Sequence, residues 1–163
     1  MLMQELIAAA AKIGAILKDR HETIAVGESS AGGLISAALL AMPGASAYFF
    51  GGAIVYTRAS RRDLLAIPDA AFAGIKPGSE ELALVIARGA RTRLAATWGI
   101  SEIGAAGPTG TSYGHPAGSC WIAVAGPLER AITVQTGLSD RYTNMVKFAA
   151  AALDLMAQCL ADG

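Results

Sequence analysis

The sequence predicts an α/β fold: a three-layer α/β/α arrangement around a mixed, mostly parallel sheet of about five strands. Segments with a helical repeat alternate with short strand-like segments, which is the order expected when helices cover both faces of a sheet. Hydrophobic residues make up 53% of the chain and charged residues only 16%, as is typical of strands that are buried on both faces. A chain of 163 residues is long enough for one domain with its own core, so residues 1–163 are predicted to form a single domain.

Apolar residues recur at three- and four-residue intervals in several segments, and this spacing predicts helices. The predicted helices cover about 3–18, a segment from 34 that Pro43 and Gly44 end, a segment from 79, and about 140–160; one or two helical turns are expected within 57–65. Residues 67–78 contain two prolines and two glycines and are predicted to be loop.

Five stretches that are apolar, aromatic or β-branched are predicted to be strands. They are 23–26, 47–56, 100–106, 119–125 and 131–135. The fourth is nearly all apolar and is predicted to be central, while the fifth alternates like a half-buried antiparallel partner. Gly51 and Gly52 within the second strand predict a bulge or a close approach of backbone.

Composition excludes several classes of function. A formal net charge of zero and an isoelectric point near 6.7 argue against a main role in nucleic-acid binding. Charged residues or glycine interrupt every apolar run before it could span a bilayer, and residues 1–5 lack the basic start of a secretory signal. Two cysteines without a C-x-x-C motif, and two histidines, support neither a zinc site nor a disulfide framework. We therefore expect a cytoplasmic protein with no metal and no cofactor.

On sequence grounds, the chain is organised around the turn Gly27-Glu28-Ser29-Ser30-Ala31-Gly32-Gly33. It leads from a predicted strand into a predicted helix, so its backbone N–H groups and the helix dipole could favour an anion or a polarised carbonyl. The alternative is that Ser29 or Ser30 only caps the helix and the glycines only allow the turn.

Three further features could contribute to a site. The glycine- and hydroxyl-rich loop 107–118 follows the third strand, and it is either functional or simply a mobile surface loop. Tyr56 is followed by Arg58, Arg61 and Arg62, which are either a phosphate grip or a solvated basic face. Arg141 stands at a predicted helix start, where a cation opposes the helix dipole, which points to a ligand anion or a buried acid partner.

Taken together, the motifs resemble the C-terminal domain of the CinA (competence/damage-inducible) family, whose stand-alone members are nicotinamide-nucleotide amidohydrolases. The family's Ala-Glu-Ser-Cys-Thr-Gly-Gly matches residues 27–33, and its Pro-Gly-Ser-Ser matches 43–46. Its Gly-Gly segment running through Tyr to Lys matches 51–61, its Ala-Gly-Pro loop matches 104–110 and 115–119, and its Gly-Asp-Arg matches 139–141. The likeness covers nearly the whole chain in the same order.

The resemblance implies hydrolysis of the carboxamide of nicotinamide mononucleotide to the acid and ammonia without a metal. It implies Ser29 as the nucleophile, with Ser46 as second choice, Tyr56 as proton relay, and backbone N–H groups of residues 31–33 as the oxyanion site. The catalytic set also includes Arg61. The substrate-binding set is Glu28, Ser30, Ala31, Gly32, Gly33, Gly51, Gly52, Ala106, Gly107, Pro108, Thr109, Gly110, Thr111 and Arg141.

The chain departs from the family pattern at several positions. The family's Lys falls on Arg61, which is not a practical base at neutral pH, and its Cys and Thr fall on Ser30 and Ala31. A second hypothesis is therefore a catalytically weakened paralogue that binds a nucleotide as a sensor or interaction domain, and a third is hydrolysis of another amide or ester. The expected partners are a small-molecule nucleotide and other copies of the chain, with no nucleic acid and no membrane.

Overall fold

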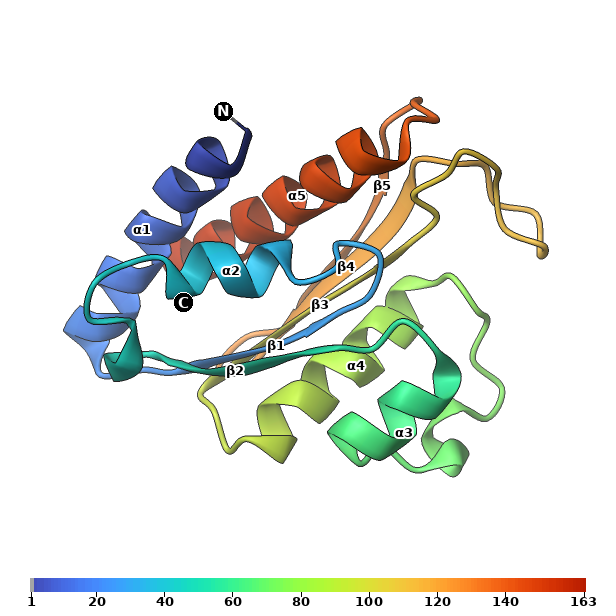
Figure 1. Cartoon of the computed structure of the whole chain (residues 1–163). Coiled ribbons are helices and arrows are strands. Elements are labelled where there is room, and N and C mark those ends of the chain that lie inside the picture. The colour runs from blue at the N-terminus through green and yellow to red at the C-terminus, as the bar shows by residue number, and fades with distance from the viewer. Residues whose placement is uncertain (1) are drawn as a thin grey trace.

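A five-stranded sheet forms the middle layer of the computed structural model, which describes residues 2–163 (Figure 1). The strands are β1 (Ile24–Glu28), β2 (Phe49–Ile54), β3 (Trp98–Gly104), β4 (Ser119–Ala125) and β5 (Arg130–Gln135), in the spatial order β2-β1-β3-β4-β5. β1 is parallel to β2 and β3, whereas β4 is antiparallel to β3 and β5. Four of the five strands therefore share a direction, which confirms the predicted mixed, mostly parallel sheet.

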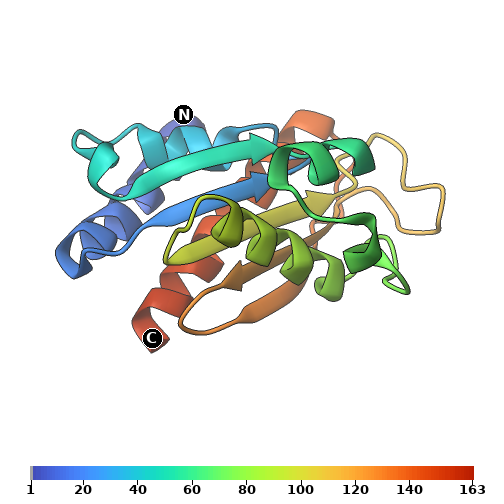
Figure 2. The same ribbon diagram turned by 90° about the horizontal axis from the view of Figure 1, so that it is seen from below.

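Helices cover both faces of the sheet, as predicted. On one face lie α1 (Leu2–Arg20), α2 (Leu34–Leu40) and α5 (Arg141–Asp162), and on the other lie α3 (Arg58–Leu65) and α4 (Glu80–Arg93). Figure 2, seen from below, shows α3 and α4 in front of the strands. Two short 3-10 turns complete the chain: η1 (Ala45–Ala47) and η2 (Asp69–Phe72), the latter within the segment predicted to be loop.

The alternation of strand side chains divides the core into two apolar clusters. Ile24, Ile100 and Ile122 pack with Phe148 under α1, α2 and α5. The intervening residues, such as Ala25, pack on the other face with α4. The third strand begins at Trp98, two residues before its predicted start, because the Trp98 N–H donates to the Thr23 carbonyl at 2.9 Å and its side chain is buried.

The glycine pair in β2 shows both of the predicted features. Ile24 pairs with Phe49 but Ala25 pairs with Gly51, so Phe50 is an extra residue and β2 is bulged there. A Cβ atom on Gly52 would overlap the Ser36 Oγ. Gly52 is therefore required for β2 to lie close to α2.

Candidate functional site

A cavity of about 390 Å³ lies at the carboxyl ends of β1 and β3, where the segments that follow the parallel strands meet. This is the edge of an α/β sheet at which ligands usually bind. Its walls come from the turns after β1 and β2, from α3, from the start of α4 and the residues before it, from the β3–β4 loop and the strands beside it, and from the start of α5. The lining residues are Ser29, Tyr56, Arg61, Pro77, Gly78, Leu82, Ile103, Gly104, Ala105, Ala106, Gly107, Thr109, Gly110, Thr111, Ser112, Tyr113, Trp121 and Arg141.

The hydroxyl of Ser29 is available to a ligand in this cavity. Its backbone N–H donates to the Glu102 carbonyl and to Glu102 Oε1, each at 3.0 Å. Among residues 2–163, none hydrogen-bonds to the Ser29 Oγ. Ser30 is buried to the same extent, but it does not line the cavity, and it donates its Oγ–H to Glu102 Oε2. The structure thus separates the two neighbouring serines, which the sequence alone leaves equivalent.

The predicted oxyanion site at residues 31–33 is wrong, because internal acceptors already occupy those N–H groups. The Ala31 N–H donates to Glu102 Oε1 at 2.8 Å, the Gly32 N–H to the Ser29 carbonyl at 3.1 Å, and the Gly33 N–H to Glu28 Oε1 at 2.9 Å. None of the three residues lines the cavity.

Glu28 was expected to bind substrate, but its carboxylate is fully buried and holds the start of α2. It accepts the N–H groups of Gly33, Ile35 and Ser36 at 2.9–3.1 Å and the Ser36 hydroxyl at 2.7 Å. A negative charge at a helix N-terminus is favourable. Because Glu28 fills this role, neither serine of the turn is the cap of α2, which corrects the alternative reading as well.

Tyr56 and Arg141, which are 85 residues apart in the sequence, meet at the cavity. Arg141 donates from Nη2 to the Tyr56 hydroxyl at 3.3 Å and from Nη1 to the Gly107 carbonyl at 2.6 Å. Among residues 2–163, no acid lies within salt-bridge distance of Arg141, so the acid partner that the sequence left open is not found there. Buried Asn144, one turn further along α5, donates to the Ala106 carbonyl at 2.8 Å and so ties the start of the helix to the loop.

The three arginines after Tyr56 do not act together. Arg61 lines the cavity and its Nε donates to the Val55 carbonyl at 3.4 Å, while burial lowers the pKa of its guanidinium. Arg62 pairs with Asp63 at 2.9 Å on the outside, and Arg58 does not line the cavity. Only Arg61 therefore supports the predicted phosphate grip.

The β3–β4 loop forms one wall of the cavity and closes on itself. The Thr111 N–H donates to the His115 carbonyl at 2.8 Å, and the His115 N–H donates to the Thr111 Oγ1 at 3.0 Å. The His115 ring lies 4.6 Å from Trp121 and 5.5 Å from Tyr113, centroid to centroid. Of the substrate-binding residues predicted at 106–111, all but Pro108 line the cavity.

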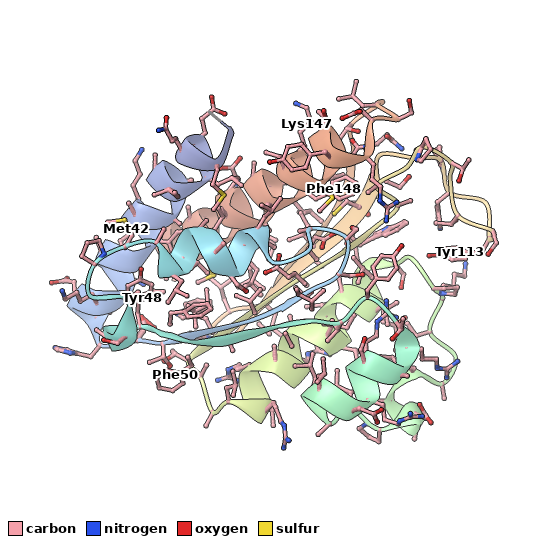
Figure 3. The ribbon with its side chains drawn as sticks, in the orientation of Figure 1. Met42, Tyr48, Phe50, Tyr113, Lys147 and Phe148 are labelled. Carbon is pink, nitrogen blue, oxygen red and sulfur yellow. The ribbon has the colours of Figure 1, made fainter. Side chains whose placement is uncertain are left out.

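Three predicted site residues lie elsewhere. Ser46 is exposed in η1, before β2, whereas Tyr56 follows β2. Since β1 and β2 are parallel, Ser46, which precedes β2, and Ser29, which follows β1, lie at opposite ends of the strands. Figure 3 shows Tyr48, two residues after Ser46, at the end of the molecule opposite Tyr113. The hypothesis that Ser46 is a nucleophile in this cavity is therefore wrong, and Gly51 and Gly52 are also outside the cavity.

Sequence reasoning missed part of the wall. Trp121 falls in the strand predicted at 119–125 and Leu82 in the helix predicted from 79, and both line the cavity. Tyr113 lies in the predicted loop, but nothing in the sequence indicated that it faces Arg61. Asn144 gave no signal because a lone amide in a helix is usually at the surface. These contacts follow from the packing of α4 and α5 on the sheet.

The fold and the site define an α/β domain with a ligand-sized polar cavity at the carboxyl edge of its parallel strands. The particular family follows from comparison with known proteins. The chain belongs to the CinA family: the model of the CinA C-terminal domain matches residues 6–160. This confirms the resemblance drawn from the motifs.

Relatives of known sequence and structure agree with this assignment. A CinA-like protein of Salinibacter ruber is 36% identical over 144 residues, which are 88% of this chain and 35% of that protein. A CinA-like protein of Prochlorococcus marinus is 43% identical over 112 residues, 69% of this chain and 26% of that protein. The chain thus spans about a quarter to a third of these relatives. The crystal structure of competence/damage inducible protein CihA from Agrobacterium tumefaciens has a TM-score of 0.86 at 26% identity, covering 96% of this chain and 95% of that one.

Two features are absent from the described part of the chain. No helix within residues 2–163 is long and apolar enough to cross a membrane. Within the same residues, no group of three or more His, Cys, Asp or Glu side chains is placed to hold a metal ion.

Proposed function

We propose that the chain is a metal-independent amidohydrolase that converts nicotinamide mononucleotide to nicotinate mononucleotide and ammonia. The observation that carries this proposal is the Ser29 hydroxyl, which is free of internal hydrogen bonds and lines the same cavity as Tyr56, Arg61 and Arg141. A cavity of about 390 Å³ is in the size range of small-molecule sites. The family resemblance supplies the substrate.

In this proposal, the Ser29 Oγ attacks the carboxamide carbon and its proton passes through the Tyr56 hydroxyl to the departing nitrogen. The C–N bond breaks, ammonia leaves, and water then hydrolyses the acyl-Ser29 ester to release the acid. The Arg141 guanidinium lies 3.3 Å from the Tyr56 oxygen, where it stabilises negative charge that develops during proton transfer.

The oxyanion donors are assigned to the β3–β4 loop, in place of residues 31–33. Thr109 and Gly110 line the cavity, and among residues 2–163 their backbone N–H groups find no protein acceptor. Two such N–H groups side by side suit a developing oxyanion.

Arg61 is assigned to the substrate phosphate. Its guanidinium is partly desolvated, and no carboxylate in the described part of the chain lies within salt-bridge distance of it. A partly buried cation without an acid partner favours an anionic ligand, and a guanidinium can bind phosphate oxygens bidentately.

Release of ammonia from nicotinamide mononucleotide by the purified protein tests the proposal. We expect turnover by the natural chain and its loss in Ser29→Ala. Ser46→Ala is a matched control, because that exposed serine lies at the other edge of the sheet, and it should keep full turnover. A natural protein no faster than buffer would refute the proposal.

A second candidate function is a catalytically weakened paralogue that binds the nucleotide without hydrolysing it. Arg61, which stands where the family has a lysine, favours it, because a guanidinium does not accept a proton at neutral pH. This candidate predicts that the nucleotide raises the melting temperature without turnover, and that Arg61→Lys introduces turnover. If no pyridine nucleotide shifts the melting temperature, this candidate is excluded.

A further inference from the structure

Two buried carboxylates lie side by side beneath the turn that bears Ser29. Glu28 on β1 and Glu102 on β3 are register partners in the parallel pairing, and both are fully buried. Both side chains accept hydrogen bonds from residues 29–36. Glu28 accepts the N–H groups at the start of α2, and binding this helix terminus accounts for its role.

Glu102 accepts hydrogen bonds from the turn itself. Its Oε1 accepts the N–H groups of Ser29 at 3.0 Å and Ala31 at 2.8 Å, and its Oε2 accepts the Ser30 hydroxyl. Three consecutive residues thus donate to one carboxyl group. An acid that is buried without a cation is costly, so its retention at this position needs a reason.

We propose that Glu102 is a positioning residue that selects Ser29, and not Ser30, as the hydroxyl that faces the cavity. This rests on the proposed function, in which Ser29 is the nucleophile. By binding the N–H groups on both sides of Ser30 together with the Ser30 hydroxyl, Glu102 turns that side chain inward. The Ser29 side chain, one residue earlier, is then left at the cavity wall.

The arrangement of donors works with the carboxyl group in either protonation state. The ionised group accepts all three hydrogen bonds. When protonated on Oε2, it donates to the Ser30 Oγ while Oε1 still accepts both N–H groups. Burial raises the pKa of Glu102 to about 7, although the hydrogen bonds from Ser30, Ala31 and Ser29 act to lower it. The titratable groups facing it are Glu28 and the Cys120 thiol, 3.9 Å away on β4.

A glutamine should therefore replace Glu102 in this role and a leucine should not. The amide oxygen of Glu102→Gln can accept both N–H groups and its NH2 can donate to Ser30. Glu102→Leu keeps the volume but offers no acceptor. Ser101→Ala is the matched control: Ser101 is buried on the same strand, but its hydroxyl donates to the Ala83 carbonyl on the opposite face of the sheet.

Two measurements test the proposal: amide hydrogen exchange by NMR, and the steady-state kinetics of nicotinamide mononucleotide deamidation. In Glu102→Leu, we expect exchange at Ser29 and Ala31 to accelerate at least tenfold relative to Gly33 and Ser36, which Glu28 holds. We expect kcat to fall at least tenfold while KM stays within about twofold. Glu102→Gln and Ser101→Ala should keep both quantities within about threefold.

Unchanged exchange at Ser29 and Ala31 in Glu102→Leu would overturn the proposal, as would a loss of kcat in Glu102→Gln equal to that in Glu102→Leu. If Glu102→Leu does not fold, Glu102→Asp takes its place: its shorter side chain withdraws the carboxyl group from the turn, so accelerated exchange at Ser29 and Ala31 supports the proposal and unchanged exchange overturns it. If the natural protein has no turnover, the proposed function fails, and the exchange rates of the same variants still decide the positioning role.

Discussion

Replacing Glu102 with glutamine should remove most of the pH dependence of stability between pH 5 and 8. The carboxyl group is fully buried and desolvation is the largest cause of its raised pKa, about 7 in the folded protein against 4.5 for the unperturbed group. As the pH rises above 4.5, the unfolded chain releases this proton first. The folded state therefore loses stability from pH 4.5 up to about 7, and the loss is complete above that pH.

The magnitude follows from the shift in pKa. At about 1.4 kcal/mol per unit, the difference corresponds to roughly 3 kcal/mol of unfolding free energy. For a domain of 163 residues this is a melting temperature roughly 6–12 °C lower at pH 8 than at pH 5 from this group alone. Glu102→Gln should match the natural protein near pH 5 and exceed it by about 3 kcal/mol at pH 8.

Urea unfolding of both proteins at pH 5, 6, 7 and 8, followed by circular dichroism, measures this difference. The work stays above pH 5 because Asp63, Glu129 and Asp140 have lowered pKa values and change stability with the opposite sign at lower pH. Ser101→Ala is the control and should keep the slope of the natural protein at reduced stability. Parallel curves for Glu102→Gln and the natural protein would refute the reasoning.

Four other substitutions probe the site and the packing behind it. Ser29→Ala should lower ammonia release from nicotinamide mononucleotide by about 10³-fold or more in a steady-state assay. Tyr56→Phe should lower kcat by about 10²-fold with little change in KM, because it removes the proton relay. Arg141→Ala should lower kcat about tenfold in the same assay, since the guanidinium that stabilises negative charge on the Tyr56 oxygen during proton transfer is lost. Gly52→Ala should destabilise the fold by about 1–3 kcal/mol in urea, because the new methyl would displace Ser36 from Glu28.

Melting temperatures separate effects on the site from effects on the fold. The three cavity variants, Ser29→Ala, Tyr56→Phe and Arg141→Ala, should melt within about 3 °C of the natural protein, as expected for substitutions outside the apolar core. Full turnover by Ser29→Ala would contradict the nucleophile assignment. An unchanged urea midpoint for Gly52→Ala would contradict the close approach of β2 and α2.

Local patterns in the sequence were sufficient for the secondary structure, and ordered motifs that resemble the CinA family indicated much of the site. Hydrophobic period and Gly/Pro stops placed the helices and strands to within a few residues, since these signals act between near neighbours in the chain. Two glycine- and hydroxyl-rich segments, the turn at 27–33 and the loop at 107–118, were each predicted to follow a strand. The resemblance to the CinA family then assigned Ser29, Tyr56, Arg61, Arg141 and most of the loop at 106–111 to the site.

The direction of each side chain in the turn was decided only by the tertiary structure. From the sequence, the N–H groups of residues 31–33 were expected to be free donors. In the structure, the Ala31 N–H donates to Glu102, which lies 71 positions further along the chain. Ser46 lies in a family-like motif, but the direction of β2 carries it to the far edge of the sheet. A hydrogen bond between residues distant in sequence leaves no periodic signal.

For this protein, then, sequence alone determined the layered α/β fold, the family, and the segments that surround the cavity, because each depends on local pattern or on ordered motifs. The tertiary structure decided which serine lines the cavity, which amides are already occupied, and which of the three arginines after Tyr56 lines the cavity. The physical reason is that two buried acids on neighbouring strands compete with any substrate for the donors of one short turn.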